Sequence, residues 1–79
     1  MDDFNMFIIV NGPRAKAQAE AIAKYYNVRC AELDDGSWKI ECSKEIEKDI
    51  CFSEEDMMQS CEKITAATGI FINFEDLEF

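Results

Sequence analysis

The sequence predicts one small α+β domain, residues 1–79, in which an antiparallel sheet carries two helices packed on one face. Three observations predict it. An apolar run is followed by an amphipathic stretch, an Asp-Gly turn signal divides two further strand-like segments, and a serine-capped helical stretch precedes a last apolar run. The chain has 79 residues and a 48% apolar share, which suits a single globular core.

The first strand and helix follow from a change in hydrophobic period. Phe4–Val10 is apolar on both alternating faces, which predicts a strand that is covered on both sides and therefore central. Gly12 ends this strand, and Pro13 suits the first position of a helix because that position needs no N–H donor. Apolar residues then recur at helical spacing and predict an amphipathic helix of about 14 residues that ends at Asn27.

Residues 28–43 predict a β-hairpin whose turn is Asp35-Gly36. A two-residue loop would pair Leu33 with Trp38 and would place the large apolar side chains on one face. A register shifted by one residue would set Trp38 opposite Glu32 and would mix apolar with charged residues. The hydrophobic pattern therefore favours the first register.

The second half of the chain predicts a clear helix between two less distinctive segments. Residues 44–52 fit either a helical turn or an edge strand. Ser53 is followed by three acidic residues, which predicts a helix start, and Gly69 suits the end of that helix. The apolar segment Ile70–Phe74 predicts the last strand, and an acidic-aromatic tail follows it.

The predicted element order is β-α-β-β-(x)-α-β, where x is the ambiguous segment 44–52. Its simplest packing is the ferredoxin-like arrangement, an antiparallel sheet with both helices on one face. Right-handed crossovers would place the first and last strands side by side at the centre of the sheet.

The residue types limit the chemistry that this chain can perform. It has no histidine, so Ser-His and Cys-His nucleophile pairs are absent, and we expect no enzymatic activity. The four cysteines lack the Cys-x-x-Cys spacing of a zinc site, so we expect reduced thiols and neither a metal nor a cofactor. The start at Met1 without a signal peptide, and the lack of a membrane-length apolar run, predict a cytoplasmic protein that does not contact membranes.

Negative charge is concentrated in the second part of the sequence. The chain holds 17 acidic and 8 basic residues, for a net charge of −9. Residues 1–30 hold three acids and four bases, a net charge of +1, whereas residues 31–79 hold fourteen acids and four bases, a net charge of −10. Such an asymmetric distribution favours a partner of opposite sign and disfavours direct binding to the phosphates of nucleic acid.

We therefore expect a non-enzymatic module that binds a protein partner with a basic surface through its own acidic surface. In size and charge the chain resembles small phage-encoded inhibitors of the anti-CRISPR or anti-restriction class, which implies mimicry of nucleic acid. The alternative is a small-molecule-sensing regulatory domain that dimerises through its sheet. The residues expected to contact the partner are the following acids: Glu32, Asp34, Asp35, Glu45, Glu47, Glu54, Glu55 and Asp76.

Overall fold

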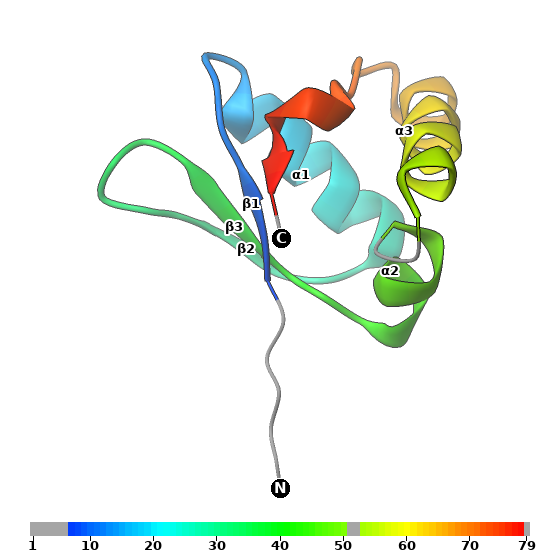
Figure 1. Ribbon diagram of the computed structural model, residues 1–79. Helices are drawn as coiled ribbons and strands as arrows, with labels where there is room; N and C mark the ends of the chain where they lie inside the picture. Colours follow the sequence, from blue (N-terminus) through cyan, green and yellow to red (C-terminus); the bar gives the residue numbers. More distant parts are fainter. Residues whose placement is uncertain (1–6, 51–52, 79) are drawn as a thin grey trace, which may run out of the picture.

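The computed structural model describes residues 7–50 and 53–78, and it confirms the α+β class. A four-stranded antiparallel sheet and three α-helices form this part of the chain (Figure 1). In chain order the elements are β1 (Phe7–Val10), α1 (Ala15–Tyr26), β2 (Cys30–Glu32), β3 (Trp38–Glu41), α2 (Lys44–Asp49), α3 (Glu54–Thr68), the 3-10 turn η1 (Phe74–Asp76) and β4 (Leu77–Glu78).

The sheet has the strand order β2-β3-β1-β4, and every neighbouring pair is antiparallel. β1 is an internal strand, as predicted, although residues 4–6 of the predicted strand lie outside the described residues. The expectation that both of its faces are covered was wrong, because Phe7 and Ile9 on one face are only half-buried. The register sets Ile8 opposite Ile40 of β3 and Val10 opposite Leu77 of β4. The first and last strands are neighbours, as predicted, but β4 is at the edge of the sheet and not at its centre.

Helix α1 ends where the sequence predicted but begins later. Asn27 follows the helix with a φ of 58°, in the left-handed conformation that ends many helices. The expectation that Pro13 occupies the first helical position was wrong, because α1 begins at Ala15. Gly12, with a φ of 96°, and the residues after it form a turn, in which the Ala15 N–H donates to the Gly12 carbonyl at 3.2 Å. The chain uses this turn to reverse direction before the helix starts.

The β2–β3 hairpin forms at the predicted turn, but the predicted register was wrong by one residue. Glu32 is opposite Trp38, so Leu33 does not pair with Trp38. The Asp35 carboxylate accepts hydrogen bonds from the backbone N–H and the hydroxyl of Ser37, and the Leu33 N–H donates to the Ser37 carbonyl at 2.8 Å. These bonds enclose a three-residue loop, which shifts the pairing by one position.

The ambiguous segment 44–52 contains helix α2, which confirms the helical alternative for residues 44–49. The Ser43 hydroxyl accepts a hydrogen bond from the Ile46 N–H at 3.2 Å and caps the helix. Ile46 and Ile50 are both buried, and their four-residue spacing places them on one side of the helical turn. Residues 51–52 lie outside the described part of the chain.

Helix α3 begins and ends as predicted. The Ser53 hydroxyl accepts a hydrogen bond from the Asp56 N–H at 3.1 Å, and Gly69 closes the helix with a φ of 78°. Both ends are determined by local side-chain and backbone chemistry, which explains why they can be predicted from the sequence.

The last strand is Leu77–Glu78, and the prediction that residues 70–74 form it was wrong. Side chains satisfy backbone donors of the apolar segment: the Ile72 N–H donates to Thr65 Oγ1 at 3.0 Å, and the Asn73 N–H donates to Gln18 Oε1 at 2.7 Å. With these partners the segment needs no neighbouring strand. Turn η1 then carries the chain back to the sheet, where Leu77 is buried beside β1.

The core lies between the sheet and the helices, and its fully buried side chains are mostly isoleucines. Helix α1 contacts β1, β2 and β3, and α3 packs against α1, α2 and η1 (Figure 1). The isoleucines with at most 1% exposed surface are Ile8, Ile22, Ile40, Ile46, Ile50 and Ile64.

Candidate functional site

Four of the predicted contact residues lie at the starts of two consecutive helices. Glu45 and Glu47 are in the first turn of α2, and Glu54 and Glu55 are in the first turn of α3. All four are exposed, and the two helices contact each other. We call these four residues the helix-start acids. The positive end of each helix dipole stabilises carboxylates at these positions, so they also contribute to the local stability of the helices.

Three further predicted residues lie on the hairpin, away from the helix-start acids. Glu32 is on the edge strand β2, Asp34 and Asp35 are in the turn, and all three are exposed. Figure 1 shows this turn at the left of the molecule and α2 and α3 at the right. Hydrogen bonds from Ser37 hold the pKa of the Asp35 carboxyl below its ordinary value. The eight predicted residues therefore do not form one continuous surface.

Asp76, the eighth predicted residue, makes contacts within the fold. Its Oδ2 accepts a hydrogen bond from Gln18 Nε2 at 2.9 Å, and its carbonyl accepts one from the Asn11 N–H at 2.8 Å. Gln18 is 1% exposed and also binds the Asn73 backbone, so one side chain of α1 holds both ends of the segment that leads into β4. We call Gln18 and Asp76 the Gln18–Asp76 clamp.

A second hydrogen-bonded group, formed by Tyr26, Asp49 and Ser60, holds α1, α2 and α3 together. The Tyr26 hydroxyl donates to Asp49 Oδ2 at 3.0 Å, and the Ser60 hydroxyl donates to the Asp49 carbonyl at 3.0 Å. Burial raises the pKa of Tyr26 above its ordinary value, and the hydrogen bond to Asp49 raises it further. The neutral phenol is therefore favoured in the folded state, where it fixes α2 relative to α1.

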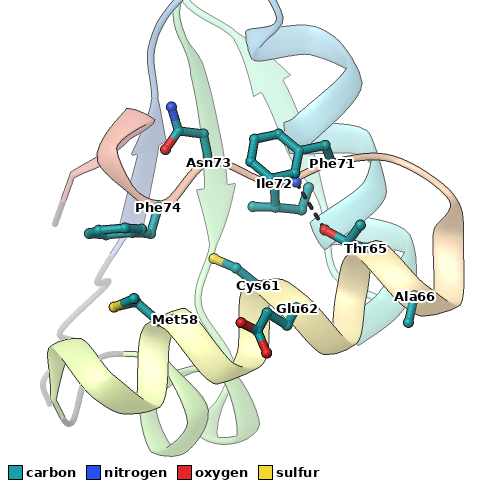
Figure 2. Close-up of a pocket in the computed structure, with 9 residues that line it drawn as sticks. All are labelled: Met58, Cys61, Glu62, Thr65, Ala66, Phe71, Ile72, Asn73 and Phe74. Atoms are coloured by element: carbon teal, nitrogen blue, oxygen red, sulfur yellow. Dashed lines mark hydrogen bonds between the residues drawn. The ribbon is translucent and has the colours of Figure 1, made fainter.

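An apolar groove of about 350 Å³ lies between α3 and residues 71–74. Figure 2 shows Met58 and Cys61 pointing from α3 toward Phe74 and Ile72 on the opposite side. The hydrogen bond between Thr65 and the Ile72 backbone, drawn as a dashed line in Figure 2, joins α3 directly to the opposite side. We call this feature the α3 groove, and its apolar lining includes Met58, Cys61, Ala66, Phe71, Ile72 and Phe74.

The α3 groove exposes two large apolar side chains. Phe71 is 57% exposed and Met58 is 43% exposed. Arg14 binds Phe71: its guanidinium donates to the Phe71 carbonyl at 3.2 Å and lies 5.8 Å from the centroid of the Phe71 ring. Glu62 is exposed and lines the groove on α3. An apolar surface with charged groups around it is typical of the centre and rim of a protein interface.

Cys61 lies in this groove but is not an activated nucleophile. It is a free thiol with 4% of its surface exposed, and burial raises its pKa to about 11. Cys30 is also a free thiol, and burial, together with the nearby Glu20 carboxylate, raises its pKa. Both thiols are therefore protonated at neutral pH, where a thiol is a poor nucleophile. Neither thiol is therefore activated for nucleophilic attack.

Sequence reasoning missed the α3 groove because it assigned residues 70–74 to a strand within the sheet. That assignment would have buried Phe71 and left no gap beside α3. The available signal was the pair of threonines in the last turns of α3, whose hydroxyls accept hydrogen bonds from the backbone of the segment that follows. Hydroxyl side chains near a helix end can hold the next residues outside regular secondary structure.

Comparison with known proteins provides no relative for this chain. A scan against protein-family models and searches of curated proteins and solved structures all found no match. Within residues 7–50 and 53–78, no helix has the length and apolar character needed to cross a membrane. The same residues contain no group of three or more His, Cys, Asp or Glu side chains that could hold a metal ion.

Proposed function

We propose that this domain is a non-enzymatic module that binds the basic surface of a protein partner through the helix-start acids. In its specific form it is an inhibitor that mimics nucleic acid and occupies the basic site of a nucleic-acid-binding protein. We further propose the ferredoxin-like class for its fold. The strand order supports this assignment, because β3 lies between β1 and β2, the two strands that α1 connects, as in a split β-α-β unit.

The observation that carries the proposal is the distribution of charge over the fold. Residues 44–78 hold ten acids and three lysines, a net charge of −7. Residues 14–29, which include α1, hold one acid and four bases, a net charge of +3. Complementary fields of this kind speed the association of two proteins, and their effect weakens as salt is added.

The density of carboxylates at the start of α3 supports the mimicry of nucleic acid. Three consecutive residues, Glu54, Glu55 and Asp56, are acidic in the first turn. A helix rises about 1.5 Å per residue, so this turn carries about one negative charge per 1.5 Å of axis. Duplex DNA carries about one charge per 1.7 Å of its axis. Over these three residues the helix axis therefore carries a charge density similar to that of duplex DNA.

The test is capture of a partner by the tagged domain from a lysate of its own cell, followed by elution with duplex DNA. We expect a nucleic-acid-binding protein to be retained at low salt and to be released both by duplex DNA and by salt. Release by an uncharged polymer at the same mass concentration serves as the control. Retention that neither salt nor DNA reverses would contradict the proposal.

Two matched variants locate the contact surface. The first neutralises the helix-start acids by Glu→Gln substitutions and is expected to weaken binding about tenfold or more. The second changes the net charge equally through exposed residues elsewhere: Glu20→Gln, Glu32→Gln, Asp34→Asn and Glu41→Gln. If the second variant loses affinity and the first retains it, the site is on the hairpin side and the helix-start acids are not the contact.

A ligand-sensing domain that pairs through its sheet is the alternative proposal. It draws support from the two half-buried apolar side chains of β1, Phe7 and Ile9, which alternate with the fully buried Ile8 and Val10. Lys39 lies over the Phe7 ring, with its Nζ 4.6 Å from the ring centroid, so this face is partly polar. Size-exclusion chromatography separates the two proposals, because the alternative requires a dimer and an Ile9→Lys substitution would then yield a monomer.

A further inference from the structure

We propose that the α3 groove binds a basic amphipathic segment of the partner protein, with an apolar side chain of that segment entering between Met58 and Phe71. The inference rests on the proposed function and names the part of the partner that the domain recognises. Helix-in-groove recognition of this kind uses apolar anchors on one helix face and charges beside them.

The shape of the α3 groove favours a protein segment. Its volume of about 350 Å³ is within the range of ligand sites. The side chains at its edge are nonetheless wide open to solvent, since Phe71 and Met58 expose 57% and 43% of their surfaces. An enclosed pocket would surround most of a small molecule, whereas an open groove covers one face of a passing chain. The groove therefore suits side chains that project from a helix or an extended segment.

The charges around the α3 groove select a basic occupant. Glu62 lines the groove on α3, and Glu75 follows Phe74 on the opposite side; both are exposed. Lys63, the lysine of α3, instead lines a separate hollow together with Lys48. Among the residues that line the groove, the charged one is thus Glu62, and Glu75 is the residue next to the lining Phe74. The Arg14 guanidinium is already bound to the backbone and ring of Phe71.

The same charges exclude the other common occupants. A second copy of this chain carries a net charge of −9, and an isologous contact would bring together two identical grooves, each lined by the Glu62 carboxylate. The negative surface of a membrane would likewise repel the groove carboxylates. A basic amphipathic segment fits both features: its apolar side chain contacts the apolar lining, and its lysine or arginine pairs with the carboxylate of Glu62.

The test measures binding of a labelled 14-residue peptide of leucine and lysine, with its leucines on one helical face, by fluorescence anisotropy. A scrambled peptide of the same composition, with its leucines distributed around the helix, is the ligand control. We expect the amphipathic peptide to bind more tightly than the scrambled one and to shift the backbone amide resonances of α3 and of residues 71–74 in an NMR titration.

Paired variants separate the apolar from the charged contribution. Met58→Gln with Phe71→Gln is expected to weaken peptide binding about tenfold or more, because it removes the apolar anchors' contacts. Glu62→Gln with Glu75→Gln is expected to weaken binding and to reduce its dependence on salt. The control is Glu20→Gln with Tyr25→Gln, which makes the same kinds of change in the hollow between α1 and α3 and is expected to leave the affinity within about twofold. All six residues are exposed in the wild type.

Each outcome distinguishes the groove inference from the proposed function. If the Met58/Phe71 variant binds the peptide as the wild type does, or if the scrambled peptide binds equally well, the groove inference is wrong. If, in the same experiments, the variant with neutralised helix-start acids no longer captures the natural partner, the proposed function holds without the groove inference. Conversely, if the groove variants weaken binding but the helix-start acids have no effect on capture, the groove is the contact and the acidic-surface proposal is wrong.

Discussion

Replacing Gln18 by alanine is expected to destabilise the fold strongly, although Gln18 is a polar residue on a helix. Its side chain is 1% exposed, donates to Asp76 Oδ2 at 2.9 Å and accepts from the Asn73 N–H at 2.7 Å. The bond to Asp76 joins α1 to η1, and the bond to Asn73 joins α1 to the segment before it. Truncation removes both bonds and leaves a cavity between these elements.

The magnitude follows from the two hydrogen bonds and the lost volume. A hydrogen bond to a charged group contributes about 1.5–3 kcal/mol, and a neutral one contributes about 0.5–1.5 kcal/mol. Because Asp76 is only partly buried, water replaces part of its bond, and we take the lower end of each range, adding about 1 kcal/mol for the cavity. The free energy of unfolding should fall by about 3 kcal/mol, which lowers the Tm of a domain of this size by about 12–24 °C.

Urea unfolding, followed by the fluorescence of the single tryptophan, Trp38, measures this change. Gln18→Glu is the matched variant, because it keeps an acceptor for the Asn73 N–H but sets a second carboxylate against Asp76. The free energy of unfolding of this variant should be lower than that of the wild type at pH 7. The difference should shrink near pH 4, where one proton shared by the two carboxyls removes their repulsion.

Two results would refute this reasoning. A loss below about 1 kcal/mol for Gln18→Ala would mean that water satisfies both partners and that the clamp contributes little. A Gln18→Glu variant whose stability relative to the wild type does not change between pH 4 and 8 would mean that the two side chains do not lie together.

Two further predictions concern α2 and the β1–α1 turn. Tyr26→Phe removes the hydroxyl bound to Asp49 and should lower the free energy of unfolding by about 1–2 kcal/mol in a urea titration. The fold raises the pKa of Tyr26, so the contribution of its neutral hydroxyl to the free energy of unfolding is complete below about pH 10 and is lost as the pH rises further. The phenylalanine variant, which has no such group, should therefore lose less stability in alkali than the wild type. Gly12→Ala should lower the Tm by more than Gly36→Ala does in thermal melts. Both glycines have a positive φ, so alanine is strained at either position. Only at Gly12 would the added Cβ also meet Asp76, at 3.1 Å from its Oδ2. Equal losses for the two alanine variants would mean that the Asp76 contact is readily relieved.

The helix boundaries illustrate what short-range chemistry can predict. Ser53, Gly69 and Asn27 act on groups within a few residues of themselves, and the structure has each in its predicted role. The capping role of Ser43 follows the same rule, but the pattern of residues 44–52 fitted two structures equally well. Burial of Ile46 and Ile50 against the rest of the core favours the helix.

The hairpin register shows where pattern reasoning reached its limit. The predicted register gave the better hydrophobic pairing, yet the Asp35 carboxylate binds Ser37 and adds a residue to the loop. A side-chain hydrogen bond within the turn therefore outweighs the pairing pattern of two short strands. The register also places Glu32 opposite Trp38 at the sheet edge, where the carboxylate is exposed.

The sequence by itself determined the α+β class, the internal position of β1, the ends of α3 and the concentration of negative charge after residue 30. These properties depend on composition, periodicity and local capping, which act within a few residues. Only the tertiary structure decided that the acids separate into helix-start and hairpin groups, that Gln18 holds Asp76, and that an open groove lies beside α3. Each of these depends on contacts between segments far apart in the chain, where burial and hydrogen bonding select one arrangement from many that the local pattern allows.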